Sequence, residues 1–151
     1  MDFELRPISK EFSKAPFDCG YHSLNDFLRL YAVKNEKLSI GKTYIGLLDT
    51  EHVCGYFTIS TAQIMTEELP ENLRRRLPRY PVPAFRIGRL AVDKKHQGAG
   101  IGQKLLKHAL QKAIEVSNNV GLYAVLVDAI DEQAKGFYLK FGFIPFDEKP
   151  L

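Results

Sequence analysis

The chain has 151 residues, 45% hydrophobic and 26% charged, which is typical of one folded globular domain and excludes collagen-like, disordered and coiled-coil proteins. Lys and Arg number 21 against 18 Asp and Glu, and the resulting net charge of +3 neither requires nor excludes a polyanionic partner. Cys19 and Cys54 lack the spacing of a disulfide framework or a metal site. We therefore expect one domain over residues 1–151, no metal and a reducing, cytoplasmic environment.

The N-terminus lacks a basic segment followed by an apolar core, so no signal peptide is expected. The longest unbroken apolar run, Leu122–Val127, is too short to cross a bilayer. We expect no contact with membranes. Apolar periodicity instead predicts alternating strands and helices along the chain. Strands are expected at Phe3–Pro7, Thr43–Leu48, Val53–Ile64, Phe85–Asp93, Gly121–Val127 and Phe143–Phe146.

Besides a short helix in a proline- and arginine-rich segment, three helices are expected among these strands. The first begins near Ser23, which is a good N-cap residue. The second is a long amphipathic helix whose apolar stripe runs through Ile101–Ile114. The third spans Glu132–Lys140 and is closed by Gly142. A segment rich in proline and arginine, Leu69–Pro83, is expected to form a short helix and a loop.

A glycine-rich stretch joins the fourth expected strand to the long helix. Its residues are Gln97, Gly98, Ala99, Gly100, Ile101 and Gly102. Unpaired N–H groups and the dipole at a helix N-terminus attract anions, and glycines let a phosphate approach the backbone. The stretch lacks the Gly-Lys-Ser/Thr of a P-loop, and Gln103 replaces the third glycine of the dinucleotide fingerprint. It predicts a different kind of pyrophosphate site; the alternative is a tight turn without a ligand.

This stretch resembles the coenzyme-binding motif Gln/Arg-x-x-Gly-x-Gly/Ala of the GNAT superfamily of acetyl-coenzyme A-dependent N-acetyltransferases. The matching positions are Gln97, Gly100 and Gly102, the preceding Leu90–Asp93, and the later segments Ala134–Tyr138 and Phe141–Phe143. The resemblance spans nearly the whole chain. It implies a single GNAT fold of the α/β (α+β) class, in which a mixed, mostly antiparallel sheet is flanked by helices and splayed to admit acetyl-CoA.

The resemblance also implies which residues contact the coenzyme. In similar enzymes pantetheine pairs with the exposed strand backbone and the diphosphate lies on the glycine turn. The implied contacts are Leu90, Ala91, Val92, Gln97, Gly98, Ala99, Gly100, Ile101, Gly102, Asp131 and Phe137. Asp131 departs from the family pattern, because many relatives carry asparagine there.

Tyr138 occupies the family position of the general acid, which protonates the leaving thiolate. Its usual pKa near 10 keeps a tyrosine protonated at neutral pH. The alternative is a helix tyrosine that packs on the coenzyme or the core. Backbone N–H groups near Leu90 or Val92 would bind the oxygen that becomes negative during transfer. No residue stands out as a general base.

The N-terminal third is similar to the GNAT toxins of bacterial type II toxin–antitoxin modules. The matching segments there are Phe17–Gly20 and Ser23–Leu28 with Ala32, and the later segments Gly55–Ser60 and Arg89–Val92 also resemble their counterparts in these toxins. Such toxins acetylate the α-amine of the amino acid on charged tRNA, and a ribbon-helix-helix antitoxin silences them. The resemblance implies aminoacyl-tRNA and such an antitoxin as partners, and a second copy of the chain in a homodimer.

Basic residues are consistent with a tRNA acceptor. Those expected to line its path are Arg74, Arg75, Arg76 and Arg79 in the proline- and arginine-rich segment, Arg86 and Arg89 after it, and Lys34, Lys37 and Lys42 at the end of the first helix. The alternative is a solvated charged face, which Glu67, Glu68 and Glu71 dilute. Two other functions stay open: a housekeeping acetyltransferase of a small amine or a protein N-terminus, and a module that senses coenzyme A without turnover.

Overall fold

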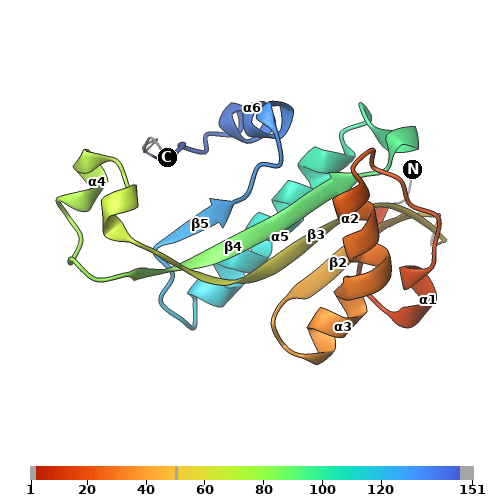
Figure 1. Ribbon diagram of the computed structural model, residues 1–151, viewed down its shortest axis with the longest axis horizontal. Helices are drawn as coiled ribbons and strands as arrows, with labels where there is room; N and C mark the ends of the chain where they lie inside the picture. The colour runs from red at the N-terminus through yellow and green to blue at the C-terminus, as the bar shows by residue number, and fades with distance from the viewer. Residues whose placement is uncertain (1–2, 50, 147–151) are drawn as a thin grey trace.

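A single five-stranded sheet forms the centre of the computed structural model, which describes residues 3–49 and 51–146 (Figure 1). In spatial order the strands are β1 (Phe3–Pro7), β2 (Lys42–Leu48), β3 (His52–Ile64), β4 (Val82–Val92) and β5 (Ala124–Val127). Neighbours from β1 to β4 pair antiparallel, whereas β4 and β5 pair in parallel. The mixed, mostly antiparallel sheet expected from the sequence is confirmed.

Helices cover both faces of this sheet. They are α1 (Lys10–Ser13), α2 (His22–Asp26), the π-helical turn η1 (Phe27–Tyr31), α3 (Ala32–Lys37), the 3₁₀ turn η2 (Thr66–Glu68), α4 (Glu71–Arg74), the 3₁₀ turn η3 (Lys94–His96), α5 (Ile101–Ser117) and α6 (Glu132–Lys140). Figure 1 shows α5 behind the sheet and α2 and α3 in front of it. Helix α6 lies above the end of β5, beside the C-terminal half of β4.

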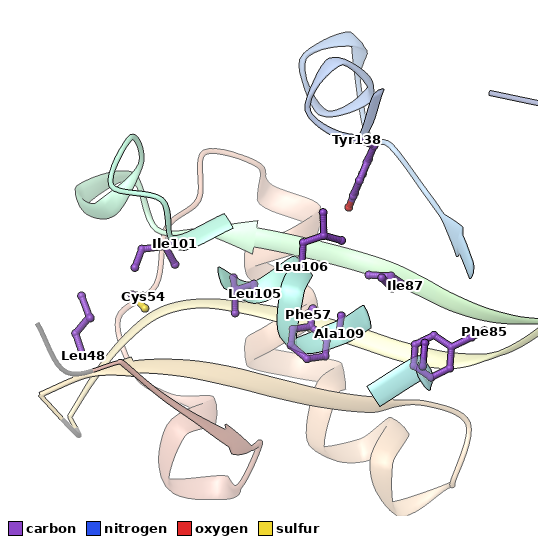
Figure 2. Close-up of a cluster of buried hydrophobic side chains, with 11 residues drawn as sticks. Leu48, Cys54, Phe57, Phe85, Ile87, Ile101, Leu105, Leu106, Ala109 and Tyr138 are labelled. Atoms are coloured by element: carbon purple, nitrogen blue, oxygen red, sulfur yellow. The ribbon is translucent and has the colours of Figure 1, made fainter. Parts of the chain in front are cut away.

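Alternation along β3 divides the core into two layers, because successive strand side chains point to opposite faces. Phe57 packs with Leu105, Leu106 and Ala109 of α5, as Figure 2 shows. The preceding Tyr56 packs on the other face among residues of η1 and β2. Its hydroxyl donates to the carbonyl of Leu24 at 2.6 Å, which secures α2 to the sheet.

The first predicted helix differs from the structure in how it begins and continues. It starts at His22 with Tyr21 as the N-cap residue, so the expected Ser23 N-cap is wrong. No side chain caps this end. The helix then passes through the π-helical turn η1 before α3, so three consecutive pieces replace one regular helix.

The expected last strand, Phe143–Phe146, is wrong: the structure gives these residues no strand pairing. Pro145 has no N–H to donate to a ladder. The segment instead lines an apolar groove together with β5. Strand β5 is also shorter than expected at its start, where Tyr123 donates to the carbonyl of Pro83, which has no N–H to return the bond.

Candidate functional site

Strand β5, the last strand of the sheet, separates from β4 partway along β4. Their pairing ends at Ile87 and Val127, and the last link is the Asp128 N–H donating to the Ile87 carbonyl at 3.4 Å. Strand β4 continues to Val92 without β5 beside it, so one edge of its backbone is left unpaired. Gly88 is an extra residue at this point, since Thr58 pairs with Arg89 and the next register pair joins Ile59 to Ile87. The expected splay is confirmed.

The glycine turn leads from η3 into α5 beyond the free end of β4. Gly98 and Gly100 have φ angles of 84° and 81°, in the left-handed region that favours glycine. A Cβ added at either position would meet nothing within 4 Å. Lys104 makes the first helical bond, to the Gly100 carbonyl at 3.1 Å. The N–H groups of the three preceding helix residues have no partner within the helix and can bind an anion.

Gln97 and Asp93 hold this turn in shape. The Gln97 amide donates to the carbonyls of Val92 at 3.0 Å and Cys19 at 3.3 Å. The buried Asp93 carboxylate accepts the N–H groups of Lys95 at 2.9 Å and Asp18 at 3.3 Å. The Gln97 side chain is thus engaged by the backbone, and its contribution to an anion site is limited to its own N–H group.

Tyr138 lies where α6 meets the splayed strands. Its side chain is 5% exposed and packs edge-on against Phe137 and Phe143. Figure 2 shows the ring extending from α6 toward β4 with its oxygen at the tip. Burial, assisted by the negative charge of Asp128, raises the pKa of Tyr138 to about 12. The hydroxyl has no protein hydrogen-bond partner within residues 3–49 and 51–146, so it is available as a donor.

Two further residues expected at the coenzyme lie on α6. The Phe137 ring approaches Gly102, where an added Cβ would meet it at 3.6 Å. Asp131 is the N-cap of α6 and accepts the Ala134 N–H at 2.9 Å through one carboxylate oxygen. Its other oxygen accepts the hydroxyl of Tyr21, and these hydrogen bonds lower the pKa of Asp131. The Asp131 carboxylate is therefore already occupied by protein donors.

A cavity of about 480 Å³ opens at the splay. Tyr138, Leu90 and Gly88 line it, together with residues of α2 and η1 on the other side. Arg86 and Arg89 from the predicted basic set line it as well. The guanidinium of Arg89 stacks 3.7 Å above the centre of the Phe27 ring. The structure thus brings the expected acid and two expected basic residues to one cavity.

Sequence reasoning missed Asp128, which also lines this cavity. Its carboxylate accepts Arg86 Nε at 2.8 Å and lies 2.6 Å from Arg86 Nη2. The available signal is a single acidic residue directly after the apolar strand β5. Because 42 positions separate Asp128 from Arg86, the spacing gives no hint of their contact.

The other basic residues lie outside the cavity. Arg75 pairs with Glu71 at 2.9 Å, and Arg74 donates to the Glu67 carbonyl at 3.4 Å. Lys34 and Lys37 line a separate hollow with α1. In Figure 1, α4 and α3 lie at different parts of the sheet. The predicted basic set is therefore divided among several surfaces.

Two kinds of feature are absent from the described part of the chain. No helix in it is long and apolar enough to span a membrane. Nor do three or more His, Cys, Asp or Glu side chains come together there in a group that could hold a metal ion.

Comparison with known proteins places this geometry in context. The family model described as an acetyltransferase (GNAT) domain matches residues 41–145. A curated protein of Mycobacterium tuberculosis, described as a tRNA-acetylating toxin, is 33% identical over 146 residues, covering 97% of this chain and 87% of that protein.

Solved structures agree with these matches. A tyrosine-to-phenylalanine mutant of KacT has a TM-score of 0.91 and 32% identity, covering 99% of this chain and 91% of that one. AtaT complexed with acetyl-methionyl-tRNAfMet has a TM-score of 0.87 and 29% identity, with coverage of 99% and 91%. A mutant AtaT bound to acetyl-CoA and the C-terminus of its antitoxin AtaR has a TM-score of 0.77 and 28% identity, with coverage of 98% and 88%.

Proposed function

The chain belongs to the GNAT acetyltransferase family, and we propose that it is a toxin that acetylates the α-amine of aminoacyl-tRNA and so blocks translation. The observation that carries the proposal is the cavity at the splay, where Tyr138, the free edge of β4 and two arginines meet. A relative named for tRNA acetylation and a neighbour complexed with acetylated tRNA support the choice of acceptor.

The residues fit acetyl-CoA at the splay and the glycine turn. The unpaired edge of β4, through Leu90, Ala91 and Val92, can pair with the pantetheine amides as an added strand does. The turn from Gln97 through Ala99 to Gly102 offers backbone N–H groups to the diphosphate. When bound, acetyl-CoA supplies the activated acetyl group. The acetyl oxygen is polarised by N–H groups of the β4 edge, which cost no rearrangement at the moment of transfer.

Tyr138 is the general acid in this proposal. Its pKa of about 12 means that the hydroxyl carries its proton throughout the neutral range. The hydroxyl therefore donates to the sulfur that leaves as the amide forms. Placement on α6 between the splayed strands supports this role more than the alternative of simple packing, because the hydroxyl has no protein acceptor among the residues described.

The cavity also supports a nucleic-acid acceptor over a free small amine. Arg89 places positive charge beside the transfer site, with its guanidinium stacked on the Phe27 ring, whereas the charge of Arg86 is paired with Asp128. We propose that the 3′ end of a charged tRNA enters here, with Arg76 and Arg79 contacting RNA further out.

The family membership also supports a proposal for the partners of the protein and for its cellular compartment. We propose that residues 1–151 act as one GNAT domain in the cytoplasm, where tRNA is charged. A ribbon-helix-helix antitoxin would neutralise the protein, and a neighbour solved with the C-terminus of its antitoxin supports this. We also propose a homodimer as the active form.

Cell-free translation tests the toxin function. The purified protein should stop protein synthesis only when acetyl-CoA is present, and fresh charged tRNA should restore synthesis once the protein has been removed. Inhibition without acetyl-CoA, or no inhibition with it, contradicts the proposal.

A further inference from the structure

Asp128 lies at the point where β5 separates from β4. It directly follows β5, and its N–H makes the last link to β4 at Ile87. Its side chain faces the cavity that Leu90 and Tyr138 line. Among the described residues lining this cavity, Asp128 is the only acid. A carboxylate is therefore placed where the acceptor meets the acetyl group.

Arg86 holds this carboxylate by one oxygen. Both Nε and Nη2 of Arg86 contact Oδ2 of Asp128, at 2.8 and 2.6 Å. The other oxygen, Oδ1, has no protein hydrogen-bond partner in the part of the chain that the structure describes. The two side chains are 45% and 42% exposed, so their ion pair contributes little to stability. The pair fixes a carboxylate at the cavity wall, with one oxygen free of protein partners among the described residues.

We infer that Oδ1 of Asp128 binds the α-amino group of the acceptor amino acid while Arg86 holds the carboxylate in place. The inference rests on the proposed function, because that function brings the amine to this cavity. A carboxylate only accepts hydrogen bonds, and an amine offers N–H donors. An α-amino group with a pKa near 8 is largely cationic at neutral pH, so the cationic Arg89 repels it and Asp128 attracts it.

Arg86 also moderates the effect of this contact on the amine. A lone carboxylate would stabilise the ammonium form, which cannot attack the acetyl group. The guanidinium beside Oδ2 offsets part of that negative charge. Asp128 can therefore orient the amine toward the transfer site without strongly opposing the loss of its proton. The raised pKa of Tyr138, to which the Asp128 charge contributes, shows that both groups share the same electrostatic environment.

Asp128→Asn tests the contact without changing the size of the side chain. The KM for charged tRNA should rise about ten- to hundredfold, as expected for a lost hydrogen bond to a charged group, and the affinity for acetyl-CoA should not change. A matched control is Glu4→Gln, which breaks the similarly exposed Arg6–Glu4 pair on β1. The control should leave both constants unchanged. An unchanged KM in Asp128→Asn overturns the inference.

A second substrate isolates the amine itself. tRNA carrying the 2-hydroxy analogue of the amino acid lacks the cationic group, so its inhibition constant should differ by less than about threefold between the wild type and Asp128→Asn. An equal loss of affinity for both tRNAs would show that Asp128 supports RNA binding in general and overturn the inference.

Exchanging the two charges separates substrate binding from a structural role. The double variant Arg86→Asp with Asp128→Arg restores an ion pair but moves the carboxylate. It should remain as impaired as Asp128→Asn; recovery would make the pair structural and overturn the inference. The ratio of the KM of each variant to the KM of the wild type is also measured with a small primary amine as the acceptor. If the wild-type protein acetylates only that amine, the proposed function is contradicted. The KM ratios for the amine then still decide whether Asp128 binds the acceptor amine.

Discussion

At the residue scale, Tyr138 is the proposed general acid. Tyr138→Phe removes the donor hydroxyl and keeps the ring that packs on Phe137 and Phe143. The rate of acetyl transfer should fall about 10²- to 10⁴-fold, the usual contribution of a general acid. Calorimetric titration should show an acetyl-CoA affinity within about threefold of the wild type, since the β4 edge and glycine turn are untouched. Tyr123→Phe, at an exposed tyrosine beside β5, is the control; equal rates in both variants would remove Tyr138 from the mechanism.

The pKa of Tyr138 also has a consequence for stability. The folded protein holds this proton more tightly than the unfolded chain, with a pKa of about 12 against 10.0. This proton therefore contributes about 3 kcal/mol to the free energy of unfolding. The stabilisation is fully present below pH 10 and is lost as the pH rises through 12.

Urea unfolding measured at several pH values up to 12 checks this contribution. The free energy of unfolding should fall more steeply above pH 10 in the wild type than in Tyr138→Phe. The comparison is needed because the pKa of Tyr56 is also raised by burial and adds to the slope in both proteins. Parallel curves for the two proteins would show that the hydroxyl titrates normally.

At the element scale, α5 must approach β3 closely, and Gly55 permits this. A Cβ at Gly55 would lie 2.7 Å from both the Ala91 carbonyl oxygen and Cδ1 of Leu105. Because the carbonyl belongs to the paired strand β4, it cannot move away cheaply. Gly55→Ala should therefore lower the free energy of unfolding by about 1–3 kcal/mol in denaturant titration.

Gly136→Ala provides the matched control for that substitution. Gly136 lies within α6, and an added Cβ would meet nothing within 4 Å. Alanine should raise the free energy of unfolding by about 0.5–1 kcal/mol because it favours the helix. If both substitutions destabilise equally, close approach at Gly55 is not the cause.

Elements with strong local patterns were predictable. Helix α5 was expected because its apolar stripe repeats over many turns, and its buried residues include Ile101, Leu105 and Ala113. The expected strand at Phe143–Phe146 was wrong because strand formation depends on a partner edge that local sequence does not reveal. Asp128 was missed for a related reason: its place in the site depends on its contact with Arg86 of β4, which is distant in the sequence. Motif spacing placed Tyr138 on a helix, but its position over the splay depends on the tertiary fold.

At the scale of the whole molecule, charge on several surfaces should guide tRNA. Arg76 has no ion-pair partner within the described residues, unlike Arg75, which is paired with Glu71. Arg76→Glu should raise the KM for charged tRNA and reduce the slope of log affinity against log salt by about 1, as expected for one phosphate contact. Lys107→Glu on α5 reverses an equal charge on the other side of the sheet and should change neither quantity. Equal effects of the two reversals would indicate a response to net charge alone.

Acetyl transfer to the correct acceptor is the most direct test of the whole account. The purified protein is incubated with labelled acetyl-CoA and, separately, with charged tRNA, deacylated tRNA and a panel of small amines. The account predicts label on charged tRNA alone, released on mild base hydrolysis of the aminoacyl ester as the acetylated amino acid. Label on small amines with charged tRNA untouched would contradict the proposed acceptor.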